Sequence, residues 1–439
     1  MKICLIFPRM KYISGDPPLG LAYIAAYLRQ NNFDVCILDT TFSPSHDWVN
    51  SELKRLKPDV IGVYVDSIMY NDAVTIMKNA RQQGFDTIIA GGPHATICPE
   101  TLTPYATVIQ GEGEEPMAHI ARLSQEGIDF KICGSRGDIV EDLDTLPFPA
   151  LDLVDIKRYM YNWHYLEGIA PGLLGTTMIT SRGCPFNCSY CQPTLQELFG
   201  KKVRRRSPQN VVREIDQLSR LGVQGIFFQD DTFTYDGKWL EEFCSLMYGS
   251  PIKWGCNTRA DTIDAHKLKI MKEAGCLSLH IGIETYSDRI RNQIYNKRIL
   301  LSEIQEAVSL TKSYGLKSCG FFMLGAPSET KEDIKNTISY SRTLGLTEAS
   351  YSITSPLPHT HLHDMMVKSR TDLSQDFSDY DYYAGRAFQG AISFKELKWL
   401  RIWALLRFYL RPSEAWYIMS HFSNRRSFRR MLNIVGRFV

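Results

Sequence analysis

Short apolar runs alternate with helical patterns along most of this 439-residue chain. In roughly the first 130 residues, the strand candidates are residues 3–7, 34–38, 60–65, 87–90 and 107–110. Apolar residues recur at helical spacing in residues 19–30 and 72–83, and helices are also expected after Ser45, Ala95 and Glu114. Strands that alternate with helices form parallel sheets with crossover connections. The N-terminal part is therefore predicted to be a doubly wound α/β domain of about five strands.

A second alternation begins at residues 176–180 and continues to about residue 358. Its later strand candidates are residues 225–228, 253–257, 278–283, 317–324 and 348–353. Ser207-Pro208 predicts the start of a helix, and Ser302-x-x-Gln305 predicts a capping box. Six parallel strands favour a partial (β/α)6 barrel over a closed eightfold one.

Flexible or tight loops follow several strands of the first domain. They contain Pro17-Pro18-Leu19-Gly20, Gly91-Gly92-Pro93-His94 and Gly111-Glu112-Gly113-Glu114. Open parallel sheets bind ligands at this carboxyl edge, so a ligand site is expected there. The Pro-rich, non-periodic run at residues 142–149 indicates a domain boundary. We therefore predict an N-terminal domain at 1–140, a linker at 141–172, a barrel at 173–365 and a C-terminal segment at 366–439.

The C-terminal segment is helical in pattern, basic and aromatic from Phe394 onward. Its cations are Lys395, Lys398, Arg401, Arg407, Arg411, Arg425, Arg426, Arg429, Arg430 and Arg437, and its aromatic residues include Trp399, Trp403, Phe408, Tyr409, Trp416 and Tyr417. We favour a capping helical segment that packs its aromatic residues inward and displays its arginines. A surface for an anionic substrate or a membrane is the alternative.

Composition excludes some classes of protein. The 50 Lys and Arg nearly balance the 48 Asp and Glu, so bulk charge gives no reason to expect a nucleic-acid partner. Met1 leads directly into a strand-like run without a secretory pattern, and no run approaches about 18 apolar residues. The 11 cysteines suit reduced thiols and metal ligands better than a disulfide framework. These features favour a cytoplasmic protein without a transmembrane segment.

Three cysteines stand close together directly after the first strand of the second domain. The run is Gly183-Cys184-Pro185-Phe186-Asn187-Cys188-Ser189-Tyr190-Cys191. Three thiolates spaced four and three residues apart can each reach a different iron of one cubane cluster, and the fourth iron then lacks a protein ligand. That iron can chelate the amino and carboxylate groups of a methionine moiety. A structural zinc site is disfavoured because no paired Cys-x2-Cys unit supplies further ligands.

This run resembles the signature of the radical S-adenosylmethionine (SAM) superfamily, Cys-x3-Cys-x-aromatic-Cys, with Tyr190 as the aromatic residue. The resemblance implies an oxygen-sensitive enzyme that binds a [4Fe-4S] cluster through Cys184, Cys188 and Cys191, and SAM beside it. It also implies SAM contacts at the ends of the barrel strands, from Tyr190, Gln229, Asp230, Asp231, Asn257, Arg259 and Glu284, with residues 320–327 near the adenine. The acidic run at 229–233 replaces the Gly-Gly-Glu form common in the superfamily and is similar to that of the cobalamin-dependent branch.

The N-terminal domain resembles the Rossmann or flavodoxin-like cobalamin (B12)-binding domain that precedes some radical SAM barrels. The resemblance rests on residues 18–21 and on the two Gly-rich loops, and it implies cobalamin contacts from Gly91, Gly92, Gly111 and Gly113. The Asp-x-His-x-x-Gly motif that supplies a cobalt ligand elsewhere is missing, so no histidine is expected on cobalt. His94 is more simply a loop or core histidine than a metal ligand.

The resemblance implies a cobalamin-dependent radical SAM methyltransferase that acts on an unactivated carbon of a small metabolite through a 5'-deoxyadenosyl radical and methylcobalamin. It also implies a low-potential electron donor such as flavodoxin or ferredoxin. A cyclisation, rearrangement or oxidation with the same cofactors is the nearest alternative. A methylthiotransferase is less favoured because Cys4, Cys36 and Cys98 are widely spaced and fit buried small hydrophobes better than a second cluster. A non-catalytic corrinoid-binding or redox-sensing protein would not need the SAM-binding strand ends.

Overall fold

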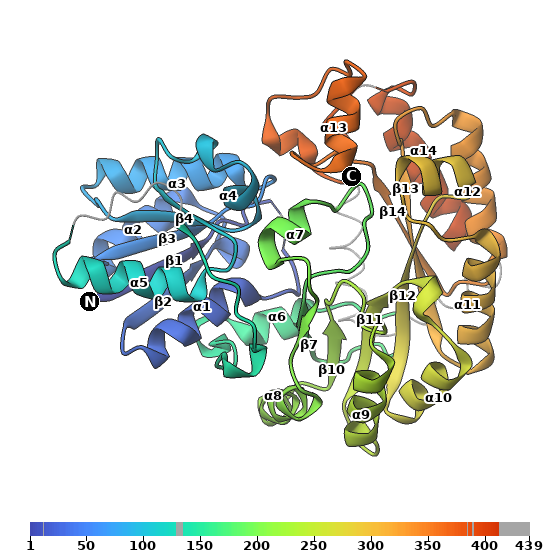
Figure 1. Ribbon diagram of the computed structural model, residues 1–439, viewed down its shortest axis with the longest axis horizontal. Helices are drawn as coiled ribbons and strands as arrows, with labels where there is room; N and C mark the ends of the chain where they lie inside the picture. Colours follow the sequence, from blue (N-terminus) through green and yellow to red (C-terminus); the bar gives the residue numbers. More distant parts are fainter. Residues whose placement is uncertain (12, 129–134, 384, 389, 412–439) are drawn as a thin grey trace. The chain divides into compact units, whose positions relative to one another are not determined.

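The chain forms two compact units in the computed structural model (Figure 1). The structure describes residues 1–411 except 12, 129–134, 384 and 389. Unit 1 contains Met1–Tyr159, Pro193–Arg204 and Asp376–Ser378. Unit 2 contains Met160–Gln192, Arg205–Gln375 and the described residues from Asp379 onward. Each unit is described below by itself.

Unit 1 is built on a parallel sheet with the strand order β2-β1-β3-β4-β5-β6. Its strands are β1 (Lys2–Phe7), β2 (Asp34–Asp39), β3 (Val60–Tyr64), β4 (Ile88–Gly91), β5 (Thr107–Gln110) and β6 (Ser135–Arg136). Its α-helices include α1 (Leu19–Gln30), α2 (His46–Leu56), α3 (Tyr70–Gln82), α4 (Pro93–Ile97), α5 (Glu114–Gln125) and α7 (Thr194–Phe199), and α6 (Ile156–Asn162) begins in it. The predicted doubly wound α/β fold is confirmed.

Two hydrophobic clusters cover the two faces of this sheet. One joins the strands to α2 and α3 through residues such as Val49 and Met77, and the other joins them to α1 and α5 through residues such as Leu21 and Ile120. The short strand β6 was not expected, because two residues carry no periodicity. Short 3₁₀ turns complete the unit at Thr40–Phe42, Pro99–Thr101, Leu143–Thr145 and Leu151–Leu153.

Unit 2 contains a six-stranded parallel sheet whose strands follow the order of the sequence, with β7 and β14 at its edges. The strands are β7 (Gly175–Met178), β10 (Gly225–Phe228), β11 (Lys253–Thr258), β12 (Cys276–Glu284), β13 (Lys317–Leu324) and β14 (Glu348–Ile353). The helices are α8 (Pro208–Arg220), α9 (Gly237–Met247), α10 (Ala265–Glu273), α11 (Leu301–Ser313), α12 (Lys331–Thr343), α13 (His361–Lys368) and α14 (Phe394–Tyr409). Figure 1 shows α8 to α12 outside the curved sheet, which confirms the partial barrel.

Smaller elements lie around this barrel. The short strands β8 (Ser181–Arg182) and β9 (Arg204–Arg205) flank the cysteine motif in the sequence, and a π-helix spans Arg289–Ile294. Ser207 caps α8 as predicted, since its side chain accepts a hydrogen bond from the Asn210 N–H. The predicted capping box at Ser302 is wrong: α11 begins at Leu301, and Glu303 Oε2 accepts from the Leu300 N–H at 2.6 Å.

The two faces of the unit 2 sheet pack against different partners. Phe228 and Trp254 contact Phe243 of α9 on the outer face. On the inner face, a Cβ at Gly175 would lie 2.2 Å from the ring of Trp163, and one at Gly255 would lie 3.0 Å from Leu166. The predicted linker therefore supplies bulky side chains to the inner face, and glycines in the strands make room for them.

Helix α14 covers the outer edge of β14. Arg401 Nε donates to the Tyr351 carbonyl at 2.8 Å, and the Tyr409 hydroxyl lies 3.2 and 3.1 Å from the backbone N and O of Ala349. Arg401 is buried whereas Trp399 is 68% exposed, so the expected display of arginines and burial of aromatic residues is wrong at these two positions. The reason is that an unpaired strand edge needs polar partners. Arg425, Arg426, Arg429, Arg430 and Arg437 lie outside the described residues.

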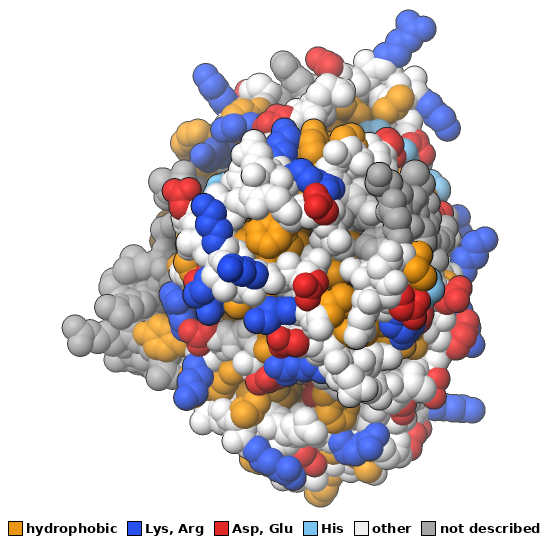
Figure 2. All heavy atoms as spheres, turned by 90° about the vertical axis from the view of Figure 1, so that its left-hand side faces the viewer, with side chains coloured by type: hydrophobic (Ala, Val, Ile, Leu, Met, Phe, Trp, Pro, Cys, Tyr) orange, Lys and Arg blue, Asp and Glu red, His pale blue; other side chains and the backbone are white. Residues whose placement is uncertain are grey.

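In the part of the chain that the structure describes, no helix has the length and apolar character needed to cross a membrane. On the face drawn in Figure 2, Lys and Arg side chains are interspersed with Asp and Glu.

We predict that Tyr409→Phe loosens the outer edge of the barrel. Without the hydroxyl, the Ala349 N–H and C=O lose a partner, at a local cost of about 1–3 kcal/mol. Hydrogen exchange of peptides that cover β14 should therefore become about tenfold faster or more. Tyr248→Phe is the matched control because Tyr248 is 74% exposed, and it should leave exchange unchanged. Equal protection of β14 in both variants would contradict the role given to Tyr409.

Candidate active site at the cysteine loop

The three motif cysteines lie in one loop of unit 2 whose backbone is fixed at several points. Within the loop, the N–H of Cys191 donates to the Cys188 carbonyl at 3.1 Å. Ser189 ties the loop to the segment that follows β12: its N–H donates to the Tyr295 carbonyl at 2.9 Å and its hydroxyl to the Ile294 carbonyl at 2.6 Å. The spacing of the cysteines is thus held by bonds to a second part of the barrel.

The three thiols match the donor set of an iron–sulfur cluster. Cys188 is buried, and Cys184 and Cys191 are half-buried. Burial raises the pKa of the Cys184 thiol to about 11 and that of Cys191 well above its usual value. Such thiols are protonated without metal, and iron binding must displace their protons. Three cysteine ligands in a restrained loop fit a cubane cluster with one iron left open.

Arg259, a predicted SAM contact, lies directly against the cysteine loop. Its guanidinium stands 3.6 Å from the centroid of the Phe186 ring, and Nη1 donates to Cys188 Sγ at 3.4 Å. Two hydrogen bonds to Asp261 and one to the Lys297 carbonyl fix its orientation. The guanidinium therefore places a positive charge beside Cys188, a predicted cluster ligand.

Tyr190 and Glu284, two further predicted SAM contacts, touch each other and Lys297. The Tyr190 hydroxyl donates to Glu284 Oε1 at 3.0 Å, and Lys297 Nζ donates to the same oxygen at 2.6 Å. Both members of the ion pair are buried. Glu284 has a φ of 67°, a conformation that costs a non-glycine residue energy and that clusters at functional sites. Sequence reasoning missed Lys297 because its approach to Glu284 depends on the fold of the π-helical segment.

Asp230 and Asp231, adjacent in sequence, have different surroundings. The Asp230 carboxylate is buried and accepts hydrogen bonds from the backbone N–H of Thr180 at 3.1 Å, from the Thr180 hydroxyl at 2.7 Å and from the Ser181 hydroxyl. It therefore holds the turn after β7, and any contact with SAM would be additional. Asp231 is exposed at the surface. The surrounding protein nevertheless removes part of the water around its carboxylate, and this desolvation, together with the negative charge of Asp230, raises the pKa of Asp231 to about 6.

Gln229 and Asn257, also predicted SAM contacts, form a polar pair at the ends of β10 and β11. Asn257 Nδ2 donates to Gln229 Oε1 at 3.3 Å, and Gln229 Nε2 donates to the Tyr165 hydroxyl at 2.7 Å. Tyr165 belongs to the predicted linker, and its sequence gave no sign of this contact. The structure thus brings the predicted residues together in pairs around the strand ends.

The Gly-rich loops of unit 1 lie at the carboxyl ends of β4 and β5, as predicted. Gly91 has no atom within 4 Å of the place where a Cβ would stand, so its neighbourhood is open. Gly92 has a φ of 117° and a Cβ there would meet the Val65 carbonyl at 2.8 Å, so its own backbone requires glycine. Gly111 also has a positive φ, and a Cβ at Gly113 would meet Ile24. Open space beside Gly91 fits the close approach of a flat cofactor.

Two polar residues of these loops are already engaged within unit 1. Glu112 forms a buried, two-bond ion pair with Arg204, at 2.6 and 3.0 Å. His94 is fully buried, with Nδ1 at 3.0 Å from the Ser67 hydroxyl and Nε2 at 3.1 Å from the Thr101 hydroxyl. The structure therefore places His94 as a core histidine. Cys4 and Cys98 are buried and Cys36 is half-buried.

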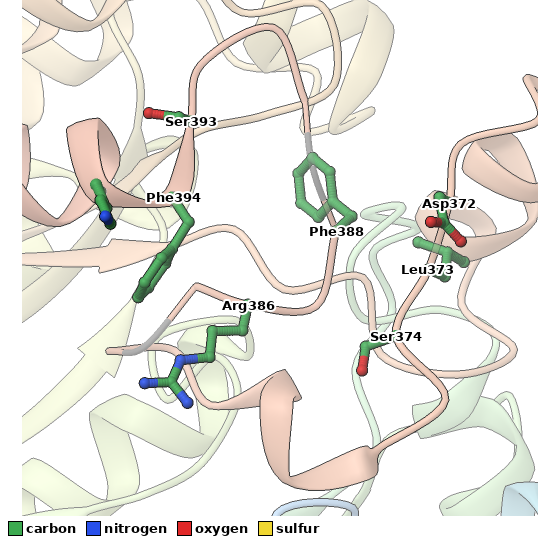
Figure 3. Close-up of a pocket in the computed structure, with 8 residues that line it drawn as sticks. Asp372, Leu373, Ser374, Arg386, Phe388, Ser393 and Phe394 are labelled. Atoms are coloured by element: carbon green, nitrogen blue, oxygen red, sulfur yellow. The ribbon is translucent and has the colours of Figure 1, made fainter.

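A separate hollow of about 480 Å³ lies in the C-terminal part of unit 2 (Figure 3). Its lining residues are Asp372, Leu373, Ser374, Arg386, Phe388, Ser393, Phe394 and Lys395. None of the predicted cluster or SAM residues lines it. Its cations, Arg386 and Lys395, are both exposed, so it shows no buried polar group aimed at a ligand.

Two protein-family models match this chain. The B12 binding domain matches residues 16–121, and the Radical SAM superfamily matches residues 178–340. The fold and the site thus define a cobalamin-dependent radical SAM enzyme, with a [4Fe-4S] cluster, SAM and cobalamin as cofactors.

Relatives extend this similarity over nearly the whole chain. An uncharacterized methyltransferase of Pyrococcus horikoshii is 31% identical over 94% of this chain and 93% of its own length. An anaerobic magnesium-protoporphyrin IX monomethyl ester cyclase of Cereibacter sphaeroides is 25% identical over 86% of this chain and 66% of its own length. This chain belongs to the family of radical SAM enzymes that carry an N-terminal B12-binding domain.

A solved structure supports the fold. The cobalamin-dependent SAM radical enzyme OxsB, with aqua-cobalamin and SAM bound, aligns with a TM-score of 0.75 at 15% identity, over 98% of this chain and 72% of that one.

We predict that Cys184→Ala, Cys188→Ala and Cys191→Ala each remove the cluster, because a cubane that loses a thiolate ligand is readily degraded. Iron and sulfide content of anaerobically reconstituted protein measures this. Cys256→Ala is a control because Cys256 is buried on β11 outside the motif, and it should retain the cluster. Near-full iron content in all three motif variants would refute the assignment.

We predict that Arg259→Met lowers the reduction potential of the cluster. The guanidinium on Cys188 Sγ stabilises the more negative, reduced cluster, so its loss disfavours reduction. If the differential stabilisation is about 1 kcal/mol, the potential falls by about 40 mV for a one-electron couple. Redox titration followed by electron paramagnetic resonance measures the shift. Arg289→Met, which removes an exposed ion pair, is the control, and an equal potential in both variants would contradict the prediction.

Proposed function

We propose that this enzyme methylates an unactivated carbon of a small metabolite. The observation that carries the proposal is the restrained three-cysteine loop at the strand ends of a chain that also has a B12-binding domain. The similarity to the Pyrococcus methyltransferase along the whole chain supports methyl transfer. We further propose a cytoplasmic location, where thiols stay reduced, and a low-potential donor such as flavodoxin or ferredoxin.

When bound, the cluster supplies an electron for the cleavage of SAM, and cobalamin carries the methyl group. Cys184, Cys188 and Cys191 would hold the cluster, and Ser189 fixes their loop. Tyr190, Lys297 and Glu284 offer a hydroxyl, a cation and a carboxylate beside the loop, which suit the polar groups of SAM. Asp231, which is adjacent to Asp230 in the sequence, offers a further, exposed carboxylate.

Cyclisation is the second candidate, because a cyclase relative covers most of this chain. The two reactions differ in whether a methyl group is added to the product. SAM labelled with deuterium in its methyl group separates them in anaerobic assays of the reconstituted holoenzyme with candidate metabolites. Methyl transfer predicts a product with a labelled methyl group, together with 5'-deoxyadenosine. A product without the label would favour cyclisation, and a labelled product formed without 5'-deoxyadenosine would overturn the proposed radical mechanism.

We predict that Gly91→Leu reduces cobalamin loading while the fold of unit 1 is kept. The leucine side chain would enter the open space beside Gly91 that the cofactor is expected to use, and no described atom of the protein blocks its Cβ. Cobalt content of protein produced with ample cobalamin measures the effect, and Gly91→Ala should have a smaller one. Gly237→Leu in unit 2 is the control. Undiminished loading in Gly91→Leu would move the corrin elsewhere.

We predict that the bound cobalamin has no histidine on cobalt. Both ring nitrogens of His94 already lie within hydrogen-bond distance of hydroxyl groups in the core of unit 1. Electron paramagnetic resonance of the Co(II) form should therefore lack nitrogen superhyperfine splitting. Splitting that disappears in His94→Ala would show that the prediction is wrong.

A further inference from the structure

A second group of metal-binding side chains lies on the inner face of the unit 2 sheet. His280 is on β12, Cys319 on β13 and Glu348 on β14. In the register of the sheet, His280 lies opposite Cys319, and Cys319 lies opposite Glu348, so the three residues form one row across neighbouring strands. Paired residues of a parallel sheet project from the same face. His280 stands four residues before Glu284, about 13 Å along the strand, so the row is distinct from the cysteine loop.

The donor atoms of this row converge. One ligand atom from each of His280, Cys319 and Glu348 lies within 4.8 Å of the other two. Tetrahedral zinc binds nitrogen and oxygen at about 2.0–2.2 Å and sulfur at about 2.3 Å, which separates its ligand atoms by about 3.3–3.8 Å. Small side-chain movements would therefore close the set around one ion.

His280 is an unpartnered polar group in this row. Its side chain is buried at 5% exposure, and neither Nδ1 nor Nε2 has a hydrogen-bond partner among the residues that the structure describes. The rings of Phe227 and Phe321 stand 4.5 and 5.4 Å away, between ring centroids, and offer no hydrogen-bond acceptor. Burial lowers the pKa of His280 to about 3, and the nearby His164 acts in the same direction. A neutral imidazole is the form that binds metal.

The charges of the row suit a divalent ion. Cys319 is buried and Glu348 is half-buried. A divalent cation with one thiolate, one carboxylate and a neutral imidazole has no net charge, which limits the cost of placing an ion in the barrel. Binding would replace the S–H bond of Cys319 with a metal–sulfur bond and release its proton to solvent. A mixed set of nitrogen, sulfur and oxygen ligands favours zinc over magnesium or calcium.

We propose that His280, Cys319 and Glu348 bind one zinc ion, with a fourth position open to water or to a heteroatom of a substrate. Three protein ligands and one open position are the arrangement of zinc sites that bind exchangeable ligands. This site goes beyond the proposed methyl transfer and does not depend on it, because none of its residues belongs to the cysteine loop.

Cobalt binding tests the site without interference from the cluster cysteines. The full chain with Cys184→Ala, Cys188→Ala and Cys191→Ala is titrated anaerobically with Co²⁺, whose spectrum reports both thiolate ligation and tetrahedral geometry. We expect one Co²⁺ per chain with a thiolate charge-transfer band, displaced by Zn²⁺. Added His280→Ala should weaken Co²⁺ binding by more than the ~10–100-fold typical of changes outside the ligand set.

Three further variants make the outcome decisive. Cys319→Ser should remove the charge-transfer band, whereas Cys244→Ser, which changes a buried thiol on α9, should keep it. Glu348→Gln should keep the charge-transfer band but weaken Co²⁺ binding. If circular dichroism shows that Cys319→Ser does not fold, Glu348→Gln serves as the test variant in its place. No thiolate band in the variant that lacks the cluster cysteines, a band that survives Cys319→Ser, or unchanged affinity in Glu348→Gln would overturn the proposal. The variant without the three motif cysteines is expected to hold no cluster, so the result of this titration is separate from the success or failure of methyl transfer.

Discussion

The contact between the Arg259 guanidinium and the cysteine loop is the interaction on which the geometry of the loop depends most. The guanidinium lies on the Phe186 ring, bonds Cys188 Sγ, and is fixed by Asp261 and by the carbonyl of Lys297. A second buried arginine, Arg291, holds the segment that carries Lys297. Its guanidinium donates to the carbonyls of Ile299, Thr285 and Tyr286. These bonds help to satisfy buried backbone carbonyls after β12, and the same segment accepts the two bonds from Ser189.

This arrangement explains why so many polar groups can be buried beside the cysteine loop. Charged side chains in a protein interior are costly unless they are paired and fully hydrogen-bonded. Glu284 is paired with Lys297, Glu112 with Arg204, and Asp230 accepts from three donors of the turn after β7. The unusual backbone of Glu284 is held in place by that pairing. His280 is the contrast, since both of its ring nitrogens lack a partner among the described residues, and this contrast motivates the zinc proposal.

Much of the architecture could be predicted because it depends on local periodicity. The strands at 107–110, 225–228, 317–324 and 348–353 have the predicted bounds, and α1 begins and ends where its apolar spacing does. The cysteine loop could be recognised from the spacing of its residues, since a cubane cluster needs thiolates that lie close together, and its role as the cluster site stays a prediction. Contacts made by tertiary packing were not predictable. Lys297 reaches Glu284 from the segment that follows a π-helix, Tyr165 reaches Gln229 from the predicted linker, and Arg401 is buried because a strand edge needs a hydrogen-bond donor.

The central claim is that the cysteine loop leaves one iron of the cluster open and that SAM binds to it beside Glu284 and Lys297. Electron–nuclear double resonance of the reduced cluster, with SAM labelled with ¹⁵N in its amino group, measures that bond directly. We predict a ¹⁵N coupling that requires Cys184, Cys188 and Cys191 and that is weakened or lost in Lys297→Met. A reduced cluster that shows no ¹⁵N coupling in the presence of saturating SAM would contradict the account.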